Sequence, residues 1–263
     1  MGELGHGNGN GAALMDFGSW VWPVSLAPFI GSFLGVLVTR VESLRGIVFG
    51  RSACLACGNR IAVRHLVPIV SWACLRGRCH TCAGTIGIFH PAIELCAVGI
   101  SIWAASMFSG GLLWESCLLG WTLLTLAATD LKHYLLPDFL TLPLAVMGLI
   151  AACASGEQAL MSAAIGTAAG YGFVILVRLL YWRLRGREGM GLGDAKLLAA
   201  SGAWLSWSGL PTVIFLGALT GLGFALFERT RGRAFSSTQR VPFGTFLCLG
   251  TWIVWLYGPL TTG

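Results

Sequence analysis

The chain has 263 residues, of which 56% are hydrophobic and only 11% are charged, and its mean hydropathy is +0.76. Soluble domains carry about a quarter charged residues, so the composition excludes an ordinary soluble fold and leaves a very apolar soluble helical protein as the one soluble alternative. Several uncharged stretches reach the ~20 residues that a helix needs to cross a ~30 Å hydrocarbon core. We therefore predict an all-α, multi-spanning membrane protein, because helices satisfy every backbone polar group without water.

The N-terminal segment does not look like a cleavable signal peptide. Residues 1–19 are rich in Gly and Asn and contain no Lys or Arg, whereas a signal peptide begins with a basic segment. We expect residues 1–19 to form a flexible tail and residues 20–42 to contain a retained first helix. The apolar runs predict eight spans: Trp20–Thr39, His90–Phe108, Leu112–Thr129, Pro137–Ala154, Ala159–Trp182, Ala195–Ser208, Leu210–Phe227 and Val241–Tyr257.

The basic residues give these spans an orientation. All 17 Lys and Arg fall in the connections after the first, third, fifth and seventh spans or in residues flanking them. The termini and the other connections have none. Because basic residues mark the cytoplasmic face of an inner-membrane protein, we predict that both termini are periplasmic and that residues 43–89 form a cytoplasmic loop.

That loop contains two Cys-x-x-Cys pairs, whose spacing is close to that of structural tetrathiolate zinc sites. Gly58 and Gly84 suit the tight turns of a zinc knuckle. Two disulfides are the alternative, but a reducing cytoplasm keeps thiols free. We predict a structural zinc ion bound by Cys54, Cys57, Cys79 and Cys82.

The arginines of the same loop would also suit a nucleic-acid-binding module. Direct attachment to a membrane span and the lack of interleaved aromatic residues argue against that interpretation. We expect no nucleic-acid partner, and we expect the arginines to enforce topology and to meet anionic lipid.

Three aspartates, Asp130, Asp138 and Asp194, lie at the predicted cytoplasmic boundary and are candidates for a catalytic pair. Asp130 ends the third span, and Asp194 opens the sixth behind Gly191 and Gly193, which allow close backbone approach and an unusual bend. Two carboxylates that meet at one site do not both ionise but share a proton. An aspartic protease needs this arrangement, because one carboxylate activates water while the protonated partner donates to the scissile carbonyl oxygen.

Two acidic residues have open roles at this stage. Asp138 starts the fourth span behind Pro137, where it either caps the helix or takes a direct catalytic part. Glu94 lies about a turn inside the second span, where an ionisable residue is either functional or paired with an arginine.

With these residues in place, the chain resembles the bacterial prepilin peptidases, which belong to the GxGD class of intramembrane aspartyl proteases. The shared landmarks are, in order, GSFLGVLVTR, the paired cysteines around VPIVSWACLRGRC, HPAIE, ATDLKHYLLPD, GLGDAKLLA and VPFGTF. The resemblance implies cleavage of type IV prepilins, or of the pseudopilins of type II secretion, after a Gly at the cytoplasmic membrane face. It implies that Asp130 and Asp194 are the catalytic residues.

The resemblance also implies a second activity. Many family members use S-adenosylmethionine to methylate the newly exposed N-terminal residue, usually Phe, and that activity is associated with the cysteine-bearing loop of residues 43–89. Residues 90–263 would then form a seven-helix peptidase domain. The pattern assigns no residues to the methyl donor and predicts no oligomeric state.

The chain departs from the family pattern at four places, none of which is a catalytic aspartate or a predicted zinc ligand. Gly35 stands where many members carry Asn, Val63-Arg64-His65 replaces a common Trp-x-Asn, Phe89-His90 replaces Arg-Tyr before Pro91, and Thr245 occupies a frequent Pro position. These departures bear on methylation and on leader recognition.

Three alternative functions remain beside this one. A leader peptidase without methyltransferase activity is the nearest. A proton- or ion-coupled transporter is the alternative of another class, because intramembrane aspartates also act as proton relays. We see no inverted repeat of the kind that transporters carry, and the aspartates lie at the membrane edge. A scaffold protein would have no need of two glycine-flanked aspartates.

Overall fold

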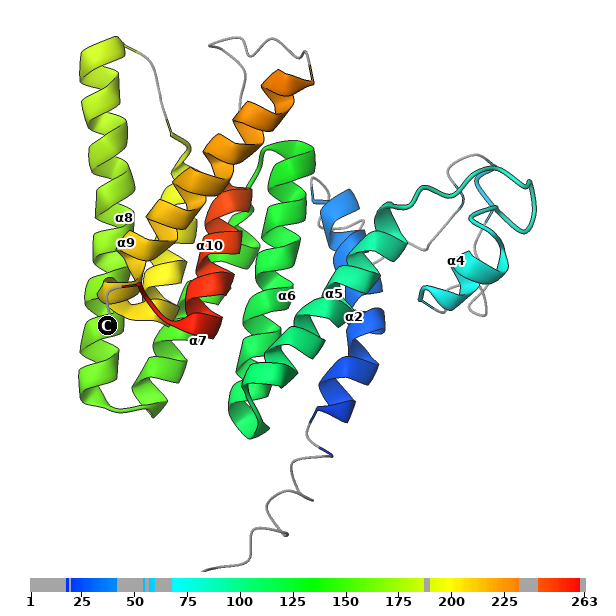
Figure 1. Cartoon of the computed structure of the whole chain (residues 1–263), viewed down its shortest axis with the longest axis horizontal. Coiled ribbons are helices and arrows are strands. Elements are labelled where there is room, and N and C mark those ends of the chain that lie inside the picture. The colour runs from blue at the N-terminus through cyan, green and yellow to red at the C-terminus, as the bar shows by residue number, and fades with distance from the viewer. Residues whose placement is uncertain are drawn as a thin grey trace, which may run out of the picture. The chain divides into compact units, whose positions relative to one another are not determined.

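The computed structural model describes residues 18, 20–41, 54, 57–59, 68–186, 190–231 and 241–260. The described part contains no strand beyond an isolated bridge between Arg78 and Thr85, which confirms the predicted all-α class. The predicted tail and most of the first half of the cysteine loop lie outside these residues. The helices are α2 (Val21–Thr39), α4 (Val70–Cys74), α5 (Phe89–Met107), α6 (Gly110–His133), α7 (Asp138–Ala154), α8 (Glu157–Arg185), α9 (Leu192–Thr230) and α10 (Phe243–Tyr257) (Figure 1).

The described helices differ in their capacity to span a membrane. Five of them, α2, α5, α6, α8 and α9, are long and apolar enough to cross it by length and composition. The apolar helices α7 and α10 are shorter, with 17 and 15 residues. The predicted sixth and seventh spans both belong to α9, which has 39 residues and a kink at Ser206, where φ is 61° and ψ is 178°. Eight crossings therefore stay a prediction.

The chain divides into two compact units, Met1–Trp121 and Thr122–Gly263, with α6 contributing residues to both. In the first unit, α2 and α5 pack backbone to backbone at Gly31, where an added Cβ would lie 2.7 Å from the Cα of Glu94. Small residues permit such close approach of membrane helices. The indole N–H of Trp121 donates to the carbonyl of Ala97 at 3.2 Å and to Ser101 Oγ at 3.1 Å, which joins α6 to α5.

In the first unit, two of the four departures from the family pattern touch each other. A Cβ added to Gly35 of α2 would lie 2.6 Å from Nδ1 of His90 on α5. The imidazole therefore fills the space that a larger residue at position 35 would need.

The kink at Ser206 divides α9 into a first and a second arm. In the second unit, α8 crosses the first arm at Gly166 and Gly170, and the two helices lie side by side in Figure 1. A Cβ on Gly202 would collide with the carbonyl oxygen of Gly166, and one on Gly170 would lie 2.5 Å from the carbonyl oxygen of Leu198. Helix α7 is bonded to the first arm of α9, where the indole N–H of Trp204 donates to the carbonyl of Leu144 at 2.8 Å.

Helix α10 packs against both arms of α9. Thr251 Oγ1 and Ser201 Oγ lie 2.7 Å apart, which holds α10 to the first arm. A Cβ on Gly250 would lie 2.8 Å from the carbonyl oxygen of Val213 on the second arm. Because α9 reverses at Ser206, α10 runs parallel to the first arm and antiparallel to the second. The N-terminal ends of α9 and α10 therefore lie at the same end of the unit.

Candidate active site

The site is built where the last turn of α6 meets the first turns of α9 and α10. Asp130 lies near the end of α6, and Asp194 lies in the first turn of α9. A Cβ added to Gly244 would lie 3.0 Å from Oδ2 of Asp130 and 3.2 Å from Oδ1 of Asp194. The two carboxyl oxygens therefore face the same glycine, and the distance between them is no greater than the sum of these two distances. The structure brings together the two aspartates that the sequence singles out.

Asp130 is buried, and backbone groups of α10 hold its carboxyl group. The N–H of Thr245 donates to Oδ2 at 2.8 Å, and the N–H of Gly244 donates to the same carboxyl group. The Thr245 hydroxyl lies 3.2 Å from Oδ2 and 3.1 Å from the carbonyl oxygen of Ala127. The first N–H groups of a helix have no partner within it, and its positive end favours an anion. The first turn of α10 is therefore a ready-made support for a carboxylate.

Asp194 is half-buried and accepts a hydrogen bond from the backbone N–H of Gly191, and the charge of Asp130 acts on it. A Cβ on Gly193 would lie 3.0 Å from Cβ of Leu136, a buried side chain that also faces Gly244. The expected close approach is thus present at Gly193. The expected unusual bend is not, because Gly191 has an ordinary φ of −75°.

Asp138 does not cap α7, so that interpretation is wrong. The cap residue is Pro137, without a side-chain cap bond. Lys196 Nζ of α9 instead donates to both carboxyl oxygens of Asp138, at 2.6 and 2.7 Å. Lys196 lies two positions after Asp194 on α9. Its ammonium group gives the Asp138 carboxylate a charged partner, which the backbone of α7 cannot provide. The pair joins α7 to α9 beside the site.

Glu94 belongs to the first unit and is 5% exposed. Its Oε2 accepts the backbone N–H of Ile69 at 2.7 Å. Ile69 has a φ of 59°, a conformation that branched residues rarely adopt. The carboxyl group thus fixes the chain just before α4, and this backbone N–H is one of its donors. The two roles that the sequence left open, a functional group or a partner of an arginine, stay predictions.

The four predicted metal ligands lie together, also in the first unit. The sulfurs of Cys54, Cys57, Cys79 and Cys82 lie within 4.8 Å of one another, and all are free thiols. The Sγ atoms of Cys54 and Cys82 are 3.8 Å apart. A tetrahedral zinc ion with Zn–S bonds of about 2.3 Å separates its sulfurs by about 3.8 Å. The four cysteines could therefore hold zinc, and they form no disulfide.

The two halves of this cluster are copies of one turn. The N–H of Cys54 donates to Asn59 and the N–H of Gly58 donates back to Cys54, both at 2.9 Å. The N–H of Cys79 donates to Gly84 at 2.8 Å, and that of Ala83 donates back to Cys79 at 2.9 Å. Gly58 (φ 70°) has the left-handed conformation as predicted. In the second turn, however, Ala83 (φ 54°) takes this place and not Gly84, because the hydrogen-bond pattern puts the left-handed residue directly after the second cysteine.

The thiols of the second turn differ in acidity. Backbone N–H groups of Cys82 and Thr81 donate to the Cys79 sulfur and lower the pKa of its thiol to about 6. At Cys82, the Gly84 N–H also lowers the pKa of the thiol. Hydrogen bonding with the Cys57 thiol is the largest of the effects that raise it, and together they raise the pKa to about 11. Thiolates are the metal-binding form, so the cluster offers one sulfur that is readily ionised and others that a metal ion would deprotonate.

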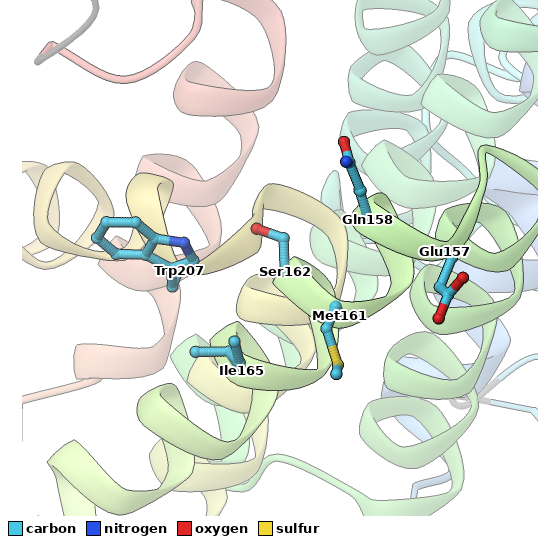
Figure 2. Close-up of a pocket in the computed structure, with 6 residues that line it drawn as sticks. All are labelled: Glu157, Gln158, Met161, Ser162, Ile165 and Trp207. Atoms are coloured by element: carbon cyan, nitrogen blue, oxygen red, sulfur yellow. The ribbon is translucent and has the colours of Figure 1, made fainter.

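A hollow of about 380 Å³ lies elsewhere in the second unit. Figure 2 shows five of its lining residues on α8, while the sixth, Trp207, follows the kink of α9. Trp207 and Asp194 stand at opposite ends of the first arm of α9, about 20 Å apart at 1.5 Å per residue. The hollow is therefore separate from the aspartates.

Sequence reasoning missed the roles of Gly244, Thr245 and Leu136. Each lies in a landmark that was already visible, VPFGTF or ATDLKHYLLPD. Gly244 and Thr245 contact the carboxyl group of Asp130 from another helix, and Leu136 faces Gly193 and Gly244. No spacing within either motif predicts these contacts.

Comparisons with known proteins match nearly the whole chain. The profile of the type IV leader peptidase family matches residues 117–226. The profile of the bacterial peptidase A24 N-terminal domain matches residues 26–108. No solved structure matches the chain.

Several curated proteins named prepilin leader peptidase/N-methyltransferase are similar to the chain over most of its length. The one from Aeromonas hydrophila is 40% identical and covers 89% of this chain and 89% of its own. The one from Dickeya chrysanthemi is 37% identical, with 87% and 90% covered. The one from Pseudomonas aeruginosa is 34% identical, with 91% and 90% covered. These matches give no support to the transporter alternative.

Proposed function

The chain belongs to the type IV leader peptidase family, and from that membership we propose that it removes the leader peptide of type IV prepilins or type II secretion pseudopilins. The cut follows a Gly at the cytoplasmic membrane face, and the enzyme then methylates the new N-terminal residue. The printed names of the relatives, which join both activities, support this proposal.

The observation that carries the peptidase assignment is the convergence of two carboxyl groups on Gly244. Two carboxyl groups so close do not both ionise, because their negative charges repel each other. The resting site therefore has one ionised and one protonated aspartate. The ionised group takes a proton from water as it attacks the scissile carbonyl, and the protonated partner donates to the carbonyl oxygen. Asp130 and Asp194 are the catalytic residues in this proposal.

The position of the site suits the proposed substrate. Asp130, Asp194 and the Asp138–Lys196 pair all lie at helix ends. A prepilin has a polar leader followed by an apolar helix, so its scissile bond lies at the membrane boundary. The distribution of Lys and Arg along the sequence assigns this boundary to the cytoplasm.

For the second activity, we place the methyltransferase-associated region in the first unit, with zinc bound by Cys54, Cys57, Cys79 and Cys82. The fit of the sulfur separation to a tetrahedral zinc ion supports this choice. Zinc would act structurally, by joining the two turns. S-adenosylmethionine is the proposed methyl donor.

The test of the peptidase proposal is reconstitution of purified protein in lipid with a prepilin, followed by leader removal. Asp130→Asn and Asp194→Asn keep the shape of the side chain but lose the acid–base function, so we expect each to lower cleavage at least 10³-fold. Asp138→Ala is the matched control, because Asp138 pairs with Lys196 outside the dyad, and it should retain substantial cleavage. Near-normal cleavage by either of the first two variants would refute the assignment.

A further inference from the structure

We propose that Thr245 is a positioning residue that sets the division of labour in the aspartate pair, making Asp130 the ionised base and Asp194 the proton donor. This inference rests on the proposed function. It goes beyond it by assigning different roles to the two aspartates and by adding a residue that the sequence marked only as a departure from the family pattern.

The first support is the asymmetry of hydrogen-bond donors. Oδ2 of Asp130 accepts the Thr245 N–H at 2.8 Å and lies 3.2 Å from the Thr245 hydroxyl, and the Gly244 N–H donates to the same carboxyl group. Asp194 receives one backbone donor, from Gly191. Hydrogen bonds to the charged form favour that form, so the negative charge of the pair is stabilised on Asp130.

The second support is the origin of these donors. Thr245 is the third residue of α10, which begins at Phe243. Its N–H is therefore one of the groups that a helix leaves without an internal acceptor. The same end of the helix carries a partial positive charge. The free N–H group and the partial positive charge both come from the backbone of the first turn of α10. They act on Asp130 in every rotamer of the Thr245 hydroxyl.

Three of the titratable groups around Asp130, namely Asp194, Cys248 and Lys196, do not supply this stabilisation. Asp194 faces it from α9, and Cys248, which is fully buried, faces both aspartates from α10. Both are acids, so their ionised forms oppose a negative charge on Asp130. Lys196 of α9 is held by Asp138. On α6 itself, Lys132 lies two positions after Asp130 and does not share its face. His133 lies three positions after Asp130 and shares its face, but it is the same in every Thr245 variant and so acts equally on all of them.

The consequence for catalysis is a fixed order of proton transfers. Asp130 enters the reaction ionised and takes a proton from water as the water oxygen bonds to the scissile carbon. Asp194 enters protonated and donates its proton to the carbonyl oxygen. The Thr245 hydroxyl can turn to Ala127 when Asp130 becomes protonated, since it lies 3.1 Å from that carbonyl oxygen.

Three substitutions separate the contributions of Thr245. Thr245→Ser keeps both donors. Thr245→Val keeps the shape and the N–H but loses the hydroxyl. Thr245→Pro loses both donors and is compatible with α10, because proline is tolerated in the first turn of a helix.

The experiment measures the pH dependence of kcat/KM for prepilin cleavage by the reconstituted full-length protein. Removing donors lets Asp130 take up a proton at higher pH, so the acidic limb of the profile should move upward. We expect no shift for Thr245→Ser, about 0.5 to 1 pH unit for Thr245→Val and about 1 to 2 units for Thr245→Pro. The thermal unfolding midpoint of each variant in detergent, compared with that of the wild type, checks that the second unit is folded.

Each result has one meaning. Graded shifts in the order Ser, Val, Pro support the proposal. Profiles that coincide with the wild type, or a loss that is equal at every pH, overturn it while leaving the peptidase assignment intact. Full cleavage by Asp130→Asn would overturn the proposed function itself.

Discussion

At the scale of single residues, Gly244 is the most constrained position in the candidate site. An added Cβ would lie 2.7 Å from Cδ1 of Leu136 and within 3.2 Å of an oxygen of each aspartate. Real Cβ atoms do not approach other atoms so closely in packed interiors. The glycine is needed for space and not for its backbone conformation, and nothing in the sequence motif alone distinguishes these two reasons.

Gly244→Ala should therefore disable the enzyme without unfolding it. Displacement of catalytic groups by about 1 Å costs about 10²-fold in rate, and we expect a loss of at least that size in prepilin cleavage. Gly223→Ala is the control, because nothing lies within 4 Å of its added Cβ, and its activity should match the wild type. Equal activity of the two variants would contradict the described packing.

The residue scale also shows what sequence reasoning reached and what it missed. The aspartates and cysteines were found because their chemistry depends on residue type and spacing. The contact between Gly35 and His90 was not found, although both had been noted as separate departures. Two side chains that share one space in different helices leave no periodic signal in the sequence. The capping role expected of Asp138 was wrong for the same reason, since Lys196 reaches it from another helix.

At the scale of helices, the apolar runs predicted the described elements well, and they placed the break within α9 close to Ser206 without indicating its cause. The two predicted spans, Ala195–Ser208 and Leu210–Phe227, are arms of one helix interrupted at Ser206. Serine gives no signal for a positive φ of the kind that glycine gives. The reversal allows both arms of α9 to contact α10. Tertiary packing, and not the local sequence, therefore explains the backbone conformation at Ser206.

The crossing of α8 and α9 offers a test at this scale. A Cβ on Gly166 would lie 2.6 Å from the carbonyl oxygen of Gly202, so backbone would have to move. We expect Gly166→Ala to lower the free energy of unfolding by about 1–3 kcal/mol, the usual cost of overpacking. The measurement is the thermal unfolding midpoint in detergent by tryptophan fluorescence.

The matched variant on the same helix is Gly172→Ala. Its Cβ would meet nothing within 4 Å, so its midpoint should equal or slightly exceed that of the wild type, because alanine favours a helix over glycine. A Gly166→Ala midpoint as high as that of Gly172→Ala would show that the two helices do not cross at Gly166.

At the scale of the whole molecule, the proposed activities use different compact units. The four cysteines belong to Met1–Trp121, whereas both aspartates belong to Thr122–Gly263. Composition and charge were sufficient to predict the membrane class, and the motifs were sufficient to predict which aspartates and which cysteines lie together. The division between the units falls inside α6, where an uninterrupted helical pattern marks no boundary.

We expect this division to make the two activities separable. Cys57→Ser removes one of four ligands, so bound zinc should fall to near zero and methyl transfer should be lost. Leader cleavage should retain more than about half its rate, because both aspartates and the groups that hold them belong to the other unit. Cys74→Ser, which changes an exposed cysteine outside the cluster, should preserve zinc and both activities. Unchanged metal content in Cys57→Ser would contradict the tetrathiolate site, and equal loss of both activities would contradict the separation.

The parallel course of α10 and the first arm of α9 has a consequence for the enzyme between turnovers. Both helices begin beside the aspartate pair, so two partial positive charges of similar size accumulate there and repel each other. One negative charge placed between them relieves that repulsion. In the proposed mechanism, the resting enzyme is therefore stabilised when the aspartate pair carries a single charge, and the scaffold favours the reactive protonation state before any substrate arrives.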